Sequence, residues 1–85
     1  MGFIDTLTRR MNRALEEGRL RLDIAREHRR KDNAARELGY IAYRRTKGAT
    51  PAEGEEEALI RKIAAAEAEI ERLRVELEKV RSEEA

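Results

Sequence analysis

Apolar residues recur at every third or fourth position through the second half of the chain, between residues 59 and 80. Side chains with this spacing lie along one side of an α-helix, and a sustained seven-residue repeat is typical of the contact line, or seam, of a coiled coil. The pattern therefore predicts a second helix over 51–83. Its predicted seam consists of Leu59, Ile63, Ala66, Ile70, Leu73, Leu77 and Val80.

The residues before this repeat contain a helix-start signal. Thr50 is suited to accept hydrogen bonds from free backbone amides at a helix N-terminus, and Pro51 suits the first helical position. Glu53 stands three residues after Thr50, which is the spacing of a capping box. We therefore expect the second helix to begin at Pro51.

Two apolar stripes run along the first half of the chain, on nearly opposite sides of a predicted helix. We expect the first stripe to complete the seam, with Leu20, Ile24, Ala35, Leu38 and Ala42. Gly18 leaves open whether 1–17 forms an amphipathic helix of its own or continues into 19–46. The second stripe contains Phe3, Ile4, Leu7, Met11, Ala14, Leu15, Leu22 and Ala25.

Between the two predicted helices, residues 47–50 are expected to form a turn, with Gly48 ending the first helix. Folding back at this turn places Leu38 near Leu59 and Leu20 near Leu77, so the apolar stripes meet. The sequence therefore predicts an all-α antiparallel helical hairpin, a coiled coil in one domain over 1–85. We expect hairpins to assemble further into a four-helix bundle.

The two arms differ in charge. Residues 1–48 contain 13 Lys and Arg against 7 Asp and Glu, a net charge of +6, whereas residues 49–85 contain 6 against 11, a net charge of −5. In the predicted register the cluster Arg29, Arg30 and Lys31 lies opposite Glu67, Glu69 and Glu71. We therefore expect ion pairs between the arms, which discourage wrong registers more than they stabilise the fold.

The size and amino-acid composition of the chain exclude several classes of function. A chain of 85 residues that is 44% charged and 4% aromatic is too small and too polar for a thick globular core. It has no cysteine and one histidine, His28, which we interpret as a residue on the helix surface or at the edge of the seam. We expect no catalytic residue, metal site or cofactor, and hence no enzyme. The absence of an apolar run or signal peptide favours a cytoplasmic protein, or one peripheral at the inner face of the membrane.

Two surfaces of the first arm remain for partners. In the predicted register Phe3, Ile4, Leu7 and Met11 extend past the second arm, and either a second copy of the chain or a membrane surface would cover them. The side turned away from the seam is basic. It suits an oligomer contact, another partner protein, anionic lipid or nucleic acid, or is simply a solvated surface. Its residues are Arg29, Arg36, Tyr40, Tyr43, Arg44 and Lys47. The expected function is that of a self-associating scaffold or adaptor, with membrane and nucleic-acid binding as alternatives.

Two resemblances agree with this interpretation. The opening Met1-Gly2-Phe3-Ile4-Asp5-Thr6-Leu7 through Asn12-Arg13-Ala14-Leu15 resembles the start of phage-shock protein A and the vesicle-inducing protein in plastids. That resemblance implies a membrane-binding amphipathic helix ahead of a coiled-coil hairpin. The stretch from Arg29 through Ala35-Arg36-Glu37-Leu38-Gly39 into the second seam is similar to small uncharacterised bacterial helical-hairpin proteins. Some of those proteins end in a zinc ribbon, whose cysteines are absent here.

Overall fold

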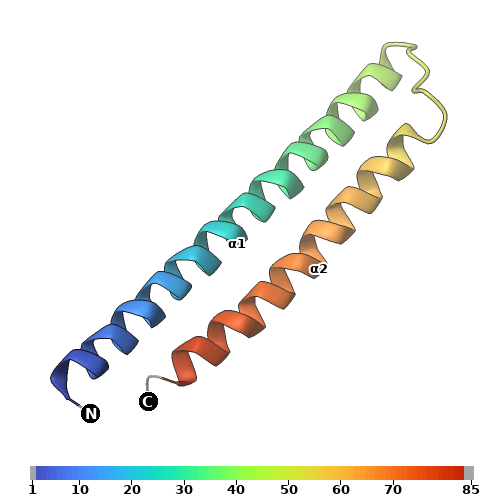
Figure 1. Cartoon of the computed structure of the whole chain (residues 1–85). Helices are drawn as coiled ribbons and strands as arrows, with labels where there is room; N and C mark the ends of the chain where they lie inside the picture. Colours follow the sequence, from blue (N-terminus) through green and yellow to red (C-terminus); the bar gives the residue numbers. More distant parts are fainter. Residues whose placement is uncertain (1, 84–85) are drawn as a thin grey trace.

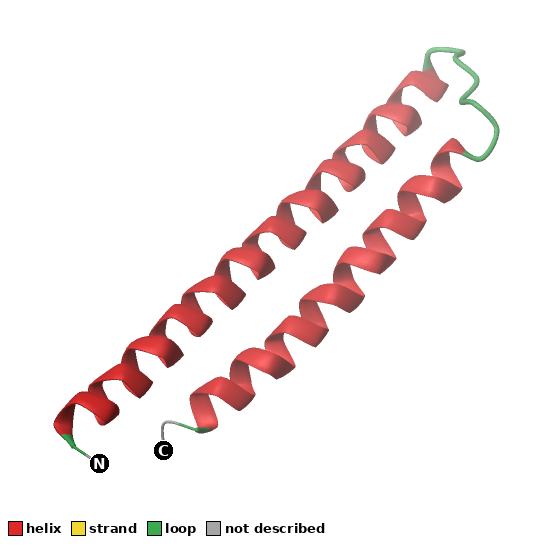
Figure 2. Ribbon diagram, in the orientation of Figure 1, coloured by secondary structure: helices red, strands yellow, loops and turns green. Residues whose placement is uncertain are grey.

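The chain folds into two antiparallel α-helices joined by a single loop, in a computed structural model that describes residues 2–83. Helix α1 spans Phe3–Thr46 and α2 spans Glu55–Ser82, and the start of α1 and the end of α2 lie at the end away from the loop (Figure 1). The described residues contain no strand (Figure 2), so the predicted all-α hairpin is confirmed. The hairpin measures 70 × 16 × 14 Å. Met1, Glu84 and Ala85, which the predicted domain 1–85 includes, lie outside the described residues.

Helix α1 is continuous through Gly18, which settles the question that the sequence left open. Gly18 and Gly39 are both exposed, and a Cβ atom at either position would meet no other atom within 4 Å. Glycine inside an exposed helix costs about 1 kcal/mol relative to alanine. The strong helix formers around both glycines are sufficient to carry the helix past them.

Gly48 ends α1 as predicted. It adopts a left-handed backbone conformation, with φ of +89°. Its N–H donates to the carbonyl of Arg45 and the N–H of Ala49 donates to the carbonyl of Arg44, both at 3.1 Å. This pair of bonds is a Schellman motif, which satisfies two of the carbonyl groups that a helix end leaves free.

The predicted start of α2 at Pro51 is wrong, because the helix begins at Glu55 and the connecting segment covers 47–54. Gly54 precedes the helix in a left-handed conformation, with φ of +78°. This conformation interrupts the right-handed helix that Thr50 and Glu53 would otherwise start. The pairing expected between those two residues occurs two positions later, where the Ala52 N–H donates to the Glu55 carboxylate at 3.1 Å.

Seven apolar side chains are buried along the line where the helices meet. The predicted seam positions Ala35 and Ala42 are not among them, because both are exposed while the residues before them, Ala34 and Ile41, are buried. Neighbouring residues on a helix lie about 100° apart, so one position moves a side chain off the seam. The remaining predicted seam positions Ile24, Leu38, Ile63, Leu77 and Val80 are half-buried. The buried residues are Leu20, Ala34, Ile41, Leu59, Ala66, Ile70 and Leu73.

Charged side chains pair mainly within each helix. In the described residues, Arg45 and Glu56 form an ion pair between the helices near the loop. At the other end Arg13 Nη1 donates to the Glu83 carbonyl at 2.7 Å. Arg30, expected to face the acidic residues of the second arm, instead binds Glu27 of its own helix at 2.9 Å. A partner one turn away on the same helix is within reach whatever the position of the other helix, so local pairs form first.

Candidate functional site

A second heptad stripe runs along α1 on the side that does not face α2. Its spacings alternate between four and three residues, as in the seam. Every member is exposed in the hairpin. We call this set the outer stripe, and it consists of Ile4, Thr8, Met11, Leu15, Gly18, Leu22 and Ala25.

Helix geometry explains why α2 leaves the outer stripe uncovered. Two residues along a helix turn it by about 200°, so Leu22 lies about 160° away from both Leu20 and Ile24 on the seam. Leu15 and Leu22 are 69% and 66% exposed, whereas Leu20 is 0% exposed. One helix therefore has two apolar sides, and the hairpin uses one of them.

The predicted partner surface matches this stripe only in part. Ile4, Met11, Leu15 and Leu22 belong to it, and Leu7 lies at its edge with 45% exposure. Phe3 is 80% exposed but lies on the seam side, because it precedes Ile24 by three heptads. Sequence reasoning missed Thr8 and Gly18 as members, although the seven-residue spacing through Met11 and Leu15 was a signal that pointed to them.

The polar groups of the outer stripe already have partners. The Thr8 hydroxyl donates to the Ile4 carbonyl at 2.9 Å, so covering Thr8 would leave no unpaired donor. At its borders Arg19 binds Glu16 at 2.7 Å, and Arg26 lies 3.7 Å from Asp23. The Glu16 carboxylate, by accepting this hydrogen bond, raises the pKa of Arg19. The stripe is thus apolar in its middle and charged at its rims, as protein interfaces commonly are.

The basic face continues the same side of α1 toward the loop. Leu15, Leu22, Arg29, Arg36 and Tyr43 follow one another at intervals of seven residues, so they form one line along the helix. The structure exposes all six predicted basic-face residues. The Lys47 ammonium lies 5.7 Å from the centre of the Tyr43 ring, within the range of a cation–π contact.

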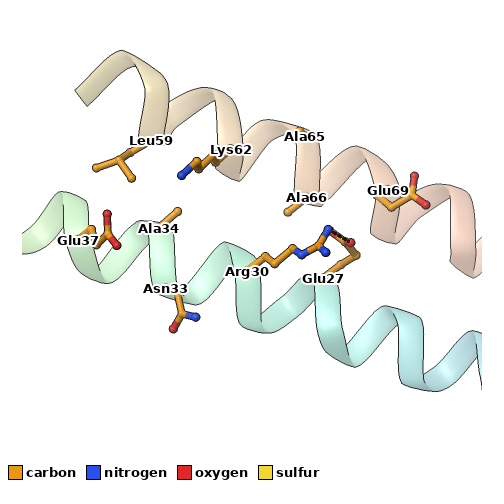
Figure 3. A pocket seen from close by; sticks show the side chains of 10 residues that line it. All are labelled: Glu27, Arg30, Asn33, Ala34, Glu37, Leu59, Lys62, Ala65, Ala66 and Glu69. Atoms are coloured by element: carbon orange, nitrogen blue, oxygen red, sulfur yellow. Dashed lines mark hydrogen bonds and ion pairs between the residues drawn. The ribbon is translucent and has the colours of Figure 1, made fainter. Parts of the chain in front are cut away.

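The side of the hairpin between the two helices contains a groove of about 670 Å³ (Figure 3). Ala34 of α1 and Ala66 of α2 are small residues at facing seam positions, and they leave space that larger side chains would fill. Charged side chains of both signs form the rims. They include Lys62 of α2 and, on α1, the ion pair between Arg30 and Glu27. The groove therefore lies beside the seam, where Ala34 and Ala66 are both buried, and its rims carry charges of both signs.

The other ion pairs that change a pKa join residues within one helix. On α2, Arg72 donates to Glu69 at 3.0 Å and to Glu76 at 2.8 Å. The hydrogen bond from Arg72 lowers the pKa of Glu69, and the same contact raises the pKa of Arg72.

His28 is half-buried, and residues 2–83 contain no group of three or more His, Cys, Asp or Glu placed to hold a metal ion. Neither α1 nor α2 has the length and apolarity that crossing a membrane requires.

In comparisons with known proteins, no family model, curated protein or solved structure matches this chain.

Proposed function

We propose that this protein is a non-enzymatic scaffold or adaptor that associates with further copies of itself through the outer stripe of α1. The observation that supports the proposal is a second heptad stripe, fully formed and left exposed by the hairpin. Heptad stripes of this length are typical of helices that pack on another helix. Two hairpins joined in this way give a four-helix assembly.

The apolar content of the stripe supports association in water. Ile4, Met11, Leu15 and Leu22 are between 57% and 76% exposed, which is unusual for four large apolar side chains in one line. Full burial of such a side chain contributes about 1.5–3 kcal/mol. In a symmetric dimer the same residue is buried in both copies, so one substitution changes the interface at two places.

Sedimentation velocity over a range of concentrations tests the proposal. We expect wild type to sediment as a dimer or larger assembly at micromolar concentration. Leu15→Glu should weaken association by about 100-fold or more, because each dimer loses two buried leucines and gains two buried charges.

The control is Val75→Glu, which places the same new charge at a 47% exposed position on α2. It should associate like wild type. Circular dichroism should show both variants as helical as the parent, since glutamate is a good helix former. A wild type that stays monomeric at all concentrations would rule out the proposal.

A second candidate is peripheral membrane binding, which the position of Phe3 favours. Phe3 and Ile4 are 80% and 76% exposed at the open end of the hairpin, close to Arg9, Arg10 and Arg13. An apolar tip beside basic residues suits an anionic lipid surface. Flotation with phosphatidylserine vesicles tests it: Phe3→Ser should reduce flotation and leave self-association unchanged. Equal flotation of wild type and variant would argue against lipid binding.

A further inference from the structure

The outer side of α1 changes character along its length. From Ile4 to Ala25 the line is mainly apolar. The same spacing then continues through Arg29, Asp32, Arg36, Gly39 and Tyr43, with the other basic-face residues beside it. All of these stripe and basic-face residues are exposed. Two copies packed in parallel would set like charges against each other at three successive positions of this line, Arg29, Asp32 and Arg36, which is a repulsive arrangement. An antiparallel arrangement keeps the basic segments apart.

We infer that two copies pack antiparallel through the apolar part of the outer stripe, overlapping only between about residues 3 and 25. This inference rests on the proposed self-association and specifies its geometry. The two-fold axis passes near residue 13 of both copies. Ile4 of one copy then lies opposite Leu22 of the other, and Met11 lies opposite Leu15. Thr8 lies opposite Gly18, where the absence of a side chain leaves room.

Charges at the rims select this register. The layer spacing of an antiparallel coiled coil places Asp5 of one copy beside Arg26 of the other, twice in each dimer. Asp5 has the Gly2 N–H at 3.4 Å as its hydrogen-bond donor, and Arg26 has Asp23 at 3.7 Å, so both retain capacity for another partner. In the parallel arrangement Arg21 would instead lie beside Arg26. Sliding the antiparallel pair by one heptad would bring Arg19 against Arg19 and Arg29 over Ile4.

The two stripes of α1 determine the shape of the dimer. Because the seam and the outer stripe lie on nearly opposite sides, each α2 stays on the outside of the central α1 pair. The four helices therefore form a layer with the order α2, α1, α1, α2, staggered lengthwise. The basic segments and the loops end up at the two far ends, and the assembly is about 100 Å long, since each α1 extends about 33 residues from the axis at 1.5 Å per residue.

Disulfide cross-linking tests the orientation, because the chain has no cysteine of its own. Ile4→Cys and Leu22→Cys are prepared separately, mixed in equal amounts and oxidised. The antiparallel dimer predicts that the mixed disulfide dominates and that each variant alone cross-links poorly. A strong disulfide of Leu22→Cys with itself would overturn the antiparallel geometry while leaving self-association standing. If sedimentation finds these variants and wild type monomeric, both the geometry and the proposed function fail.

A charge exchange gives an independent readout by sedimentation. Arg26→Asp should weaken the dimer about three- to tenfold, because it replaces two attractive rim pairs with Asp–Asp pairs. Adding Asp5→Arg to Arg26→Asp should restore wild-type affinity. A parallel dimer predicts the opposite sign for the single variant, since Arg26→Asp would remove the repulsion from Arg21, and tighter association would therefore contradict the inference.

Discussion

At the scale of single residues, burial separates two leucines that look alike in the sequence. Leu20 is 0% exposed against α2, whereas Leu22, two positions away, is 66% exposed. A two-residue step places them on opposite sides of α1. Their contributions to the stability of the isolated hairpin should therefore differ sharply.

Leu20→Ala should lower the free energy of unfolding by about 2–4 kcal/mol, because it removes packed apolar atoms and leaves a cavity. Leu22→Ala is the matched control and should change it by less than about 0.5 kcal/mol. Urea unfolding of both variants, at protein concentrations below self-association, measures the difference. Equal losses would mean that the seam does not run through Leu20.

Protonation of Glu69 should weaken α2. The hydrogen bond from Arg72 lowers the pKa of Glu69 in the folded state, so its stabilising contribution is present above the pKa of the unfolded chain. The contribution is lost as the pH falls through the lower, folded-state value. We expect the melting temperature of wild type to exceed that of Glu69→Gln at neutral pH, and the gap to close in acid. Glutamate carboxyl groups titrate in the acid range, so lowering the pH to about 3 should reduce this difference in melting temperature. A difference that stays constant from neutral pH to about pH 3 would contradict the assignment.

At the scale of elements, the sequence was informative where one local rule acted alone. Gly48 ended α1 because nothing competed with its left-handed conformation. The start of α2 was misplaced because Thr50, Pro51 and Glu53 matched a capping pattern while Gly54 interrupted it. The seam was shifted at Ala35 and Ala42 because alanine is apolar enough to fit several stripes, and packing against α2 selected Ala34 and Ile41 instead.

Two glycines should respond in opposite directions to alanine. Gly48→Ala should destabilise the hairpin by about 1–2 kcal/mol, because an L-residue is strained at φ of +89°. Gly39→Ala should stabilise it by about 0.5–1 kcal/mol, because the new methyl group meets open space on a regular helix. Thermal unfolding followed by circular dichroism measures both. A stabilising Gly48→Ala would show that the turn does not need its left-handed conformation.

At the scale of the whole molecule, the opposite net charges of the arms correctly indicated that the chain folds back. They did not predict the individual ion pairs, because a residue such as Arg30 finds its partner on its own helix. The exposed stripe could be foreseen from the spacing of Met11, Leu15 and Leu22. The sequence placed it opposite the seam stripe of Leu20 and Ile24, and in the structure it is exposed on that side.

Small-angle X-ray scattering tests the central claim most directly, because one measurement gives both the mass and the maximum dimension. The claim is that the hairpin leaves the outer stripe of α1 for a second copy. It predicts twice the chain mass of 9.8 kDa at micromolar concentration or above. The predicted maximum dimension is about 100 Å, from two staggered helices rising 1.5 Å per residue. A particle of single-chain mass with the 70 Å length of one hairpin would contradict it.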